Sequence, residues 1–189
     1  MLIIGLTGTI GSGKSTVAQY LEKEGFVWID ADKAGHEFLE EDSPVYKDIM
    51  NLFGTNARES IREQVFIDPE KLESLNNLLH PLINQTIKQC LNCFDIAAPN
   101  KIVIDAALLF EIGLDKYCEE IWAVWSNKRL IKSRMKAKNW SPALVNKVLK
   151  VQKDLDFLID NADIILENNG DRVDLLEQVM YQVNRINNE

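Results

Sequence analysis

The chain has 189 residues, of which 46% are hydrophobic and 26% charged, and its formal net charge at pH 7 is −8. This length suits one compact α/β body with a helical appendage, and the negative charge argues against general binding to nucleic acid. No run approaches the ~20 apolar residues of a membrane helix, and the cysteines and histidines are too scattered to predict a zinc site.

The start of the chain predicts a strand, a helix and a second strand. Residues 2–6 form a short apolar run before a glycine-rich turn, which is typical of a buried parallel strand. Residues 15–24 have apolar side chains at helical spacing, and Gly25 stops the helix. Residues 26–29 complete a βαβ unit. Because no basic leader precedes the first strand, we expect no secretory signal and a cytoplasmic location.

The segment between the second and third strands is predicted to be largely helical. Helices are expected over residues 34–39, 44–53 and 68–93, with Pro69 at the first position of the last helix. This segment is too long for a single crossover connection, so we expect part of it to form a substrate-binding insertion.

The remaining residues alternate between strands and helices. Ser141 and Pro142 are typical of an N-cap and a first helical residue. The expected strands are 101–105, 120–125 and 163–166, and the expected helices are 127–138, 142–153 and 171–186.

Residues 8–15 form a complete phosphate-binding loop of the pattern G-x-x-x-x-G-K-[ST]. Its glycines let successive backbone N–H groups point at phosphate oxygens, and the helix that follows presents its positive end to them. Lys14 can reach the β- and γ-phosphates, and the Ser15 hydroxyl can bind Mg²⁺. The strand before the loop and the helix after it make the match specific.

This loop predicts a P-loop NTPase fold, a three-layer α/β/α arrangement with a five-stranded parallel sheet, a helical substrate-binding insertion and a helical lid. The nucleotide-binding core is expected over residues 1–33, 94–126 and 154–189. The helical acceptor-substrate region is expected over 34–93 and the lid over 127–153.

The loop alone leaves open a switch GTPase, a regulatory ATPase or a small-molecule kinase. A GTPase usually has an N-K-x-D segment that reads guanine. The three Asn-Lys pairs, at residues 100, 127 and 146, lack the required Asp, and motor-type ATPases usually need a longer chain. The kinase interpretation is favoured by elimination.

Two pairs of acidic residues are candidates for the chemistry. Asp30 and Asp32 follow the second strand, at the edge of a parallel sheet where ligands bind, and a carboxylate there can orient an acceptor hydroxyl. Either residue can instead cap the next helix. Asp105 and Glu111, at and after the end of the third strand, can order Mg²⁺ or its waters, although Asp105 also suits a local cap.

Residues 126–153 contain nine Lys or Arg and no Asp or Glu, in an otherwise acidic chain. A basic segment of this kind is either a solvated helix face or a surface that meets phosphates.

Several stretches together form a specific combination. Besides the loop in Gly5–Val17, they are Asp30-Ala31-Asp32, Leu79-His80-Pro81-Leu82-Ile83, Leu108-Leu109-Phe110-Glu111, and Gln152 with Ala162-Asp163 and Asn168-Asn169-Gly170. Across the whole chain this combination resembles the dephospho-coenzyme A kinase family. Thr9, Ala57 and Ala107 stand where the family pattern has Gly, Asp and Pro.

The resemblance implies ATP-dependent phosphorylation of the ribose 3′-hydroxyl of dephospho-CoA, which gives CoA and ADP and is the last step of coenzyme A synthesis. It implies Asp32 as general base and Lys14 as a second catalytic residue, with ATP and Mg²⁺ as cofactors and Ser15 as metal ligand. The residues expected to bind the acceptor are Asp32, Arg58, His80 and Glu111. Those expected to bind ATP are Gly11, Ser12, Gly13, Lys14, Ser15, Thr16 and Arg134.

The lid departs from the family pattern, which places two arginines at the positions of Ser133 and Ala137. Arg134 lies one residue from the first of these positions and is the expected ATP contact. A shift of one residue turns a helical side chain by about 100°.

The expected partner is the small-molecule substrate, with no nucleic acid or membrane, and the chain is expected to be a monomer or a weak homo-oligomer. Two alternatives stay open. One is another P-loop small-molecule kinase, and the other is a catalytically weak nucleotide-binding regulatory protein.

Overall fold

A computed structural model describes residues 1–94 and 101–188. The chain divides into two compact units, one of Met1–Ile29 with Phe94–Glu189 and one of Asp30–Cys93. The expected core segments 94–126 and 154–189 include residues 95–100 and Glu189, which lie outside the described residues. In the described part of the chain, no helix is long and apolar enough to cross a membrane.

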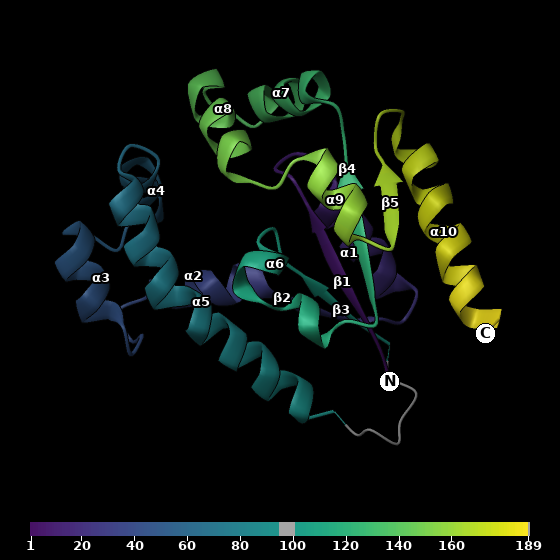
Figure 1. Ribbon diagram of the computed structural model, residues 1–189, viewed down its shortest axis with the longest axis horizontal. Helices are drawn as coiled ribbons and strands as arrows, with labels where there is room; N and C mark the ends of the chain where they lie inside the picture. Colours follow the sequence, from purple (N-terminus) through teal and green to yellow (C-terminus); the bar gives the residue numbers. More distant parts are fainter. Residues whose placement is uncertain (95–100, 189) are drawn as a thin grey trace. The chain divides into compact units, whose positions relative to one another are not determined.

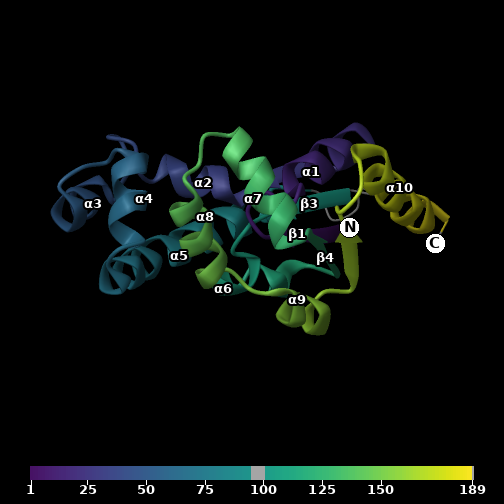
Figure 2. The same cartoon turned by 90° about the horizontal axis from the view of Figure 1, so that it is seen from above.

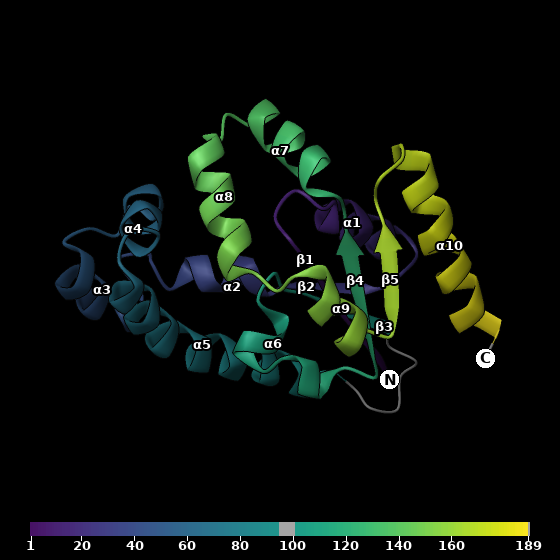
Figure 3. The same cartoon turned by 45° about the horizontal axis from the view of Figure 1, so that its top comes forward.

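A five-stranded sheet organises the first unit, as predicted. In space its strands follow the order β2-β3-β1-β4-β5 (Figure 1). The strands are β1 (Leu2–Gly8), β2 (Val27–Asp30), β3 (Lys101–Asp105), β4 (Glu120–Trp125) and β5 (Ile164–Glu167). β1 pairs in parallel with both β3 and β4, and β4 pairs in parallel with β5, so the carboxyl ends of these strands meet at one edge (Figure 3).

Helices cover both faces of this sheet, which confirms the three-layer prediction. Figure 2 shows α1 (Lys14–Lys23) and α10 (Arg172–Asn188) on one face, and α6 (Leu109–Ile112) and α9 (Leu155–Asn161) on the other. Residues 115–117 form a short 3₁₀ turn before β4.

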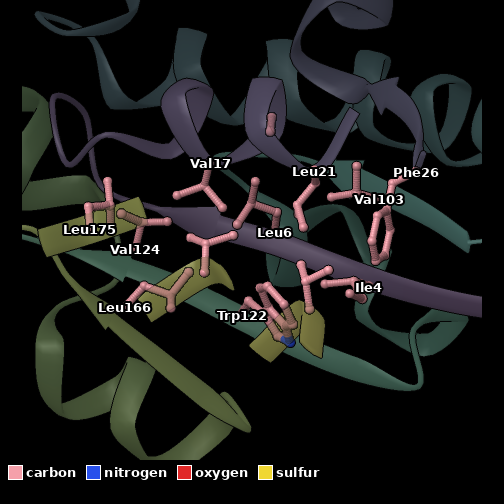
Figure 4. Packing of buried hydrophobic residues seen from close by; sticks show 13 residues of the cluster. Ile4, Leu6, Val17, Leu21, Phe26, Val103, Trp122, Val124, Leu166 and Leu175 are labelled. Carbon is pink, nitrogen blue, oxygen red and sulfur yellow. The ribbon is translucent and has the colours of Figure 1, made fainter. Parts of the chain in front are cut away.

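The main core lies between α1, α10 and the sheet. Val17 and Leu21 of α1 point onto Leu6 and Ile4 of β1, and all four are fully buried (Figure 4). Leu175 of α10 closes the cluster on its other side. Burying one such side chain contributes ~1.5–3 kcal/mol, so the packing of β1 and α1 fixes both ends of the loop that joins them.

Two basic helices form a hairpin above the sheet, α7 (Lys128–Ala137) and α8 (Pro142–Val151) (Figure 3). The predicted Ser141 cap is confirmed, because its hydroxyl accepts a hydrogen bond from the Leu144 N–H. Ile131, Met135 and Val145 are buried between the two helices, and Ile10 of the phosphate loop packs against them. The buried core of this hairpin is therefore in contact with the phosphate loop.

The second unit is helical. It consists of α2 (Ala31–Glu37), α3 (Tyr46–Phe53), α4 (Arg58–Val65) and α5 (Pro69–Asn92). The Asp30 carboxylate caps α2 by accepting from the Lys33 N–H at 2.8 Å, so this helix begins three residues earlier than predicted. α5 begins at Pro69 as predicted, runs on through Pro81 and packs against α2 and α4.

One side chain occupies the free edge of the sheet at β5. The Gln178 amide of α10 accepts from the Glu167 N–H at 2.9 Å and donates to the Glu167 carbonyl at 2.8 Å. It pairs with this residue as a neighbouring strand would.

Candidate active site

The phosphate loop joins the end of β1 to the start of α1. The Ser12 N–H donates to the Thr9 carbonyl at 3.1 Å, and the Thr16 N–H donates to the Gly13 carbonyl at 2.9 Å, which begins the helix. Gly11 and Gly13 have φ angles of 70° and 110°, a region that glycine enters without strain. The predicted loop therefore has the curled backbone that its phosphate-binding role requires.

Close contacts explain why two positions of the loop, Gly8 and Gly13, are occupied by glycine. A Cβ atom at Gly8 would lie 2.4 Å from the Val124 carbonyl oxygen, and one at Gly13 would lie 2.2 Å from Nδ2 of Asn168. Both distances are shorter than any real contact, so neither position accepts a side chain without displacing its neighbour.

Lys14 forms an ion pair with Asp105. Its ammonium donates to the Asp105 carboxylate at the end of β3, and the two side chains are only 12% and 3% exposed. The Asp105 carboxylate is thus a counter-ion of the loop lysine, and a role for it in ordering Mg²⁺ stays a prediction. It holds the ammonium beside the loop at the edge where the strands end.

The start of α1 suits a phosphate-bound metal ion. Ser15 is exposed in the first turn, where the positive helix end favours anions, and Thr16 follows it. In the described residues, no group of three or more His, Cys, Asp or Glu side chains is arranged to hold a metal. The Ser15 hydroxyl would supply one oxygen ligand, and in P-loop NTPases Mg²⁺ is held by the loop Ser or Thr together with an Asp and phosphate oxygens.

Arg134 reaches the loop from α7. Its guanidinium donates to the Gly11 carbonyl at 3.3 Å, and to the backbone carbonyl and side-chain oxygen of Asn168 at 3.0 Å each. It also donates to the Ser126 hydroxyl at 3.2 Å. The basic residue expected at the nucleotide is therefore in contact with the backbone of the loop.

Asn168 is a site residue that reasoning from sequence did not select. It follows β5, is 8% exposed and donates from Nδ2 to the Ser12 carbonyl at 2.6 Å. Its only signal was the Asn-Asn-Gly spacing near the end of the chain.

A small pocket adjoins the other end of the loop. Thr9, Glu111, Gln152 and Lys153 are among its lining residues. Gln152, just after α8, accepts from the Ile10 N–H at 2.9 Å, so the end of the basic hairpin is also bonded to the loop. The pocket places Glu111 within the surroundings of the loop.

The remaining predicted residues lie in the second unit. Asp32 is in the first turn of α2, Arg58 begins α4, and His80 lies on α5. Asp32 and Arg58 both act electrostatically on His36 of α2. Burial and the Arg58 charge lower the pKa of the His36 imidazole, and Asp32 and Asp30 oppose this shift. Arg58 and the Asp30–Asp32 pair therefore belong to one polar cluster.

Comparison with solved structures defines the class. A Thermus thermophilus protein of known structure matches 97% of this chain and 96% of its own length, at 29% identity and a TM-score of 0.79. The dephospho-CoA kinase of Campylobacter jejuni has the same fold, with a TM-score of 0.70 and 24% identity over 97% of this chain and 96% of that one. Together with the loop, this likeness defines the fold as a five-stranded parallel sheet between helices, with a P-loop after its first strand.

Comparison of sequences is more specific. The family model described as dephospho-CoA kinase matches residues 2–174. The dephospho-CoA kinase of Fusobacterium nucleatum is 36% identical over 95% of both chains, and that of Borreliella burgdorferi is 38% identical over 82% of this chain and 78% of its own. The chain belongs to the dephospho-CoA kinase family, which confirms the resemblance seen in its motifs. It is thus an ATP-using phosphotransferase with an alcohol group as acceptor.

Proposed function

We propose that this chain transfers the γ-phosphoryl group of ATP to the ribose 3′-hydroxyl of dephospho-CoA, which gives CoA and ADP in the last step of coenzyme A synthesis. The observation that carries the proposal is the family match over residues 2–174, because it includes both the phosphate loop and the acceptor-side motifs. None of the comparisons favours the alternative kinases or a regulatory protein.

On the nucleotide side, the loop backbone at Gly11, Ser12 and Gly13 surrounds the phosphates, and Lys14 neutralises their charge. This role is supported by the curled loop and by the position of the Lys14 ammonium beside it. Thr16 lies beside the phosphates at the start of α1, and Arg134 is a basic residue of the hairpin that contacts the loop. The Ser15 hydroxyl would hold Mg²⁺, which would supply charge neutralisation to the transferring group.

On the acceptor side, Asp32 accepts the proton of the attacking hydroxyl as general base. Arg58 and His80 bind anionic and polar parts of dephospho-CoA, and Glu111 holds a polar group of the acceptor near the loop. The polar cluster on α2 and α4 supports this assignment, because it brings the cationic Arg58 and the acidic Asp32 to bear on one imidazole.

The basic hairpin within residues 127–153 serves as a lid. Its cationic side chains close over the phosphates and exclude water, which would otherwise compete with the acceptor hydroxyl. The contact of Ile10 with the buried core of the hairpin supports this role.

The decisive test is a coupled assay that measures ADP formation from MgATP and dephospho-CoA, with the product identified by mass. The proposal predicts a product heavier by one phosphate, with the new group at the 3′ position. A panel of nucleoside monophosphates and sugars serves as the control set of acceptors. Faster turnover of any of these than of dephospho-CoA would contradict the proposal.

The cytoplasmic location and the monomeric or weakly oligomeric state stay predictions. Size-exclusion chromatography with light scattering, run at two concentrations, tests the second of them.

A further inference from the structure

The two peptide groups in the middle of the phosphate loop are held from outside the loop. The Ser12 carbonyl accepts from Nδ2 of Asn168 at 2.6 Å, and the Gly11 carbonyl accepts from the Arg134 guanidinium at 3.3 Å. Arg134 in turn donates to both oxygens of Asn168. Ser12 is fully buried and Asn168 is 8% exposed, so this arrangement is shielded from water.

The direction of these carbonyls fixes the direction of the neighbouring N–H groups. The described residues contain no cis peptide bond, and in a trans peptide the N–H points away from the C=O. Because the Ser12 carbonyl points to Asn168, the Gly13 N–H must point to the opposite side of the loop. That N–H is one of the groups proposed to bind phosphate.

We propose that Asn168 is a positioning residue, which with Arg134 holds the Ser12–Gly13 peptide in its phosphate-binding orientation before any nucleotide binds. This inference rests on the proposed function only in that the loop must bind phosphates. The ligand class that it concerns is any polyphosphate, with or without a nucleoside.

The chemistry of residue 168 requires an amide. The Ser12 carbonyl accepts from Asn168 Nδ2 at 2.6 Å and, at the longer distance of 3.5 Å, from the Arg134 guanidinium. Arg134 also donates to Asn168 Oδ1, so an asparagine side chain supplies both the close donor and the acceptor. An aspartate of the same shape would satisfy Arg134 but would set an acceptor against the Ser12 carbonyl. Gly13 leaves the room that this amide occupies, because a Cβ atom there would lie 2.2 Å from Nδ2 of Asn168.

The test measures the dissociation constants of MgATP and of inorganic tripolyphosphate by calorimetry for the wild type and for Asn168→Ala and Asn168→Asp. We expect both variants to bind each ligand about 10- to 100-fold more weakly, by the same factor for the two ligands, since the loop meets only phosphates. The factor corresponds to ~1.4–2.8 kcal/mol.

Asn169→Ala is the matched control. It removes the same side chain one residue further on, where Oδ1 accepts from the Asn127 N–H at 2.9 Å, from the Asn127 side-chain amide at 3.1 Å and from the Ser126 hydroxyl at 3.5 Å, none of which belongs to the loop. It should leave tripolyphosphate binding unchanged even if its thermal midpoint falls. Thermal midpoints of all variants separate a loss of folded protein from a loss of loop geometry.

Three results would overturn the inference. The first is weaker binding of ATP with unchanged binding of tripolyphosphate, which would place Asn168 at the nucleoside instead of behind the loop. The second is unchanged binding of both ligands by the folded variants, and the third is a wild-type chain that binds no tripolyphosphate. A wild type that binds both ligands but does not phosphorylate dephospho-CoA would contradict the proposed function and leave the binding comparison intact as a test.

Discussion

Lys14 has a stabilising partner as well as a proposed catalytic role, and the two effects can be separated. Lys14→Ala should lower kcat by at least ~10²-fold, the usual effect of removing one group that stabilises transition-state charge. It also removes the ammonium that pairs with the 3%-exposed Asp105 carboxylate, so the urea midpoint should fall.

The double variant Lys14→Ala/Asp105→Ala tells the two effects apart. Its urea midpoint should lie between that of Lys14→Ala and that of the wild type, and the double variant should stay inactive. Restored turnover in the double variant, or full turnover in the single one, would show that the ammonium does not act on the phosphates.

Asp32 is expected to affect the chemical step alone. Asp32→Asn keeps the size of the side chain and removes its basicity, so kcat should fall by ~10²–10⁴-fold while KM for ATP stays the same. Asp30→Ala is the comparison variant, because Asp30 caps α2 and loss of its capping oxygen should mainly lower the thermal midpoint. Full turnover by Asp32→Asn would contradict the assignment of the base.

His36 gives the protein a pH-dependent stability. Its pKa in the folded state lies below the ordinary value of 6.5, because burial and Arg58 disfavour the charged ring. Below about pH 6.5 the unfolded state therefore binds more protons, and stability falls as the pH decreases toward the folded-state pKa.

Urea unfolding between about pH 5 and 8 measures this contribution. The difference in free energy of unfolding between wild type and His36→Gln should be constant above about pH 7 and should shrink as the pH falls below 6.5. A difference that does not change with pH would show that His36 titrates alike in the folded and unfolded chain.

At the scale of elements, the junction between α8 and the phosphate loop combines the apolar packing of Ile10 with one hydrogen bond to Gln152. Gln152→Leu removes the acceptor of the Ile10 N–H with little change in size. A net loss of ~1 kcal/mol in loop ordering should raise KM for ATP about fivefold, with a smaller effect on kcat. Gln152→Glu keeps an acceptor oxygen and should retain most of the affinity, whereas equal losses in both variants would contradict this explanation.

The elements that could be predicted from sequence are those with long or clear patterns. The five strands are apolar runs, and the start of α5 has both a cap at Asp68 and Pro69 after it. The helices α4, α6 and α9 were missed, because each has eight or fewer residues, which is too short a run to show the helical period clearly. Pro81 would ordinarily argue for a break, but α5 continues because its face is buried at Leu79 and Ile83.

In the candidate site, too, some residues could be predicted from the sequence and others could not. The loop is contiguous in sequence, so its residues could be named in advance. Arg134 was selected for its charge, but its partner Asn168 is 34 residues away and has no charge or motif strong enough to mark it. Contacts of this kind depend on the pairing of β4 with β5, which no local pattern specifies.

At the scale of the whole molecule, charge is distributed unevenly. The chain has a net charge of −8, yet residues 126–153 contain nine Lys or Arg and no acidic residue. This segment should attract polyanionic substrates that the rest of the surface repels. Raising the salt concentration from ~0.1 M to ~1 M shortens the Debye length from ~10 Å to ~3 Å, and kcat/KM for ATP should fall severalfold through KM.

A variant with Lys147→Gln and Lys150→Gln provides the control for this salt effect. Both lysines lie on α8, and the variant should show a lower kcat/KM in low salt and a shallower dependence on salt. An identical dependence in wild type and variant would show that these charges do not guide the substrate.

The Gln178 amide affects the tendency of the protein to aggregate at high concentration. A free sheet edge offers N–H and C=O groups to any extended segment, and such edges start aggregation. At Glu167 these groups are already engaged by a side chain of the same molecule. A strand from another chain would have to displace Gln178 before it could extend β5, so the enzyme can be concentrated with less risk of forming intermolecular sheets.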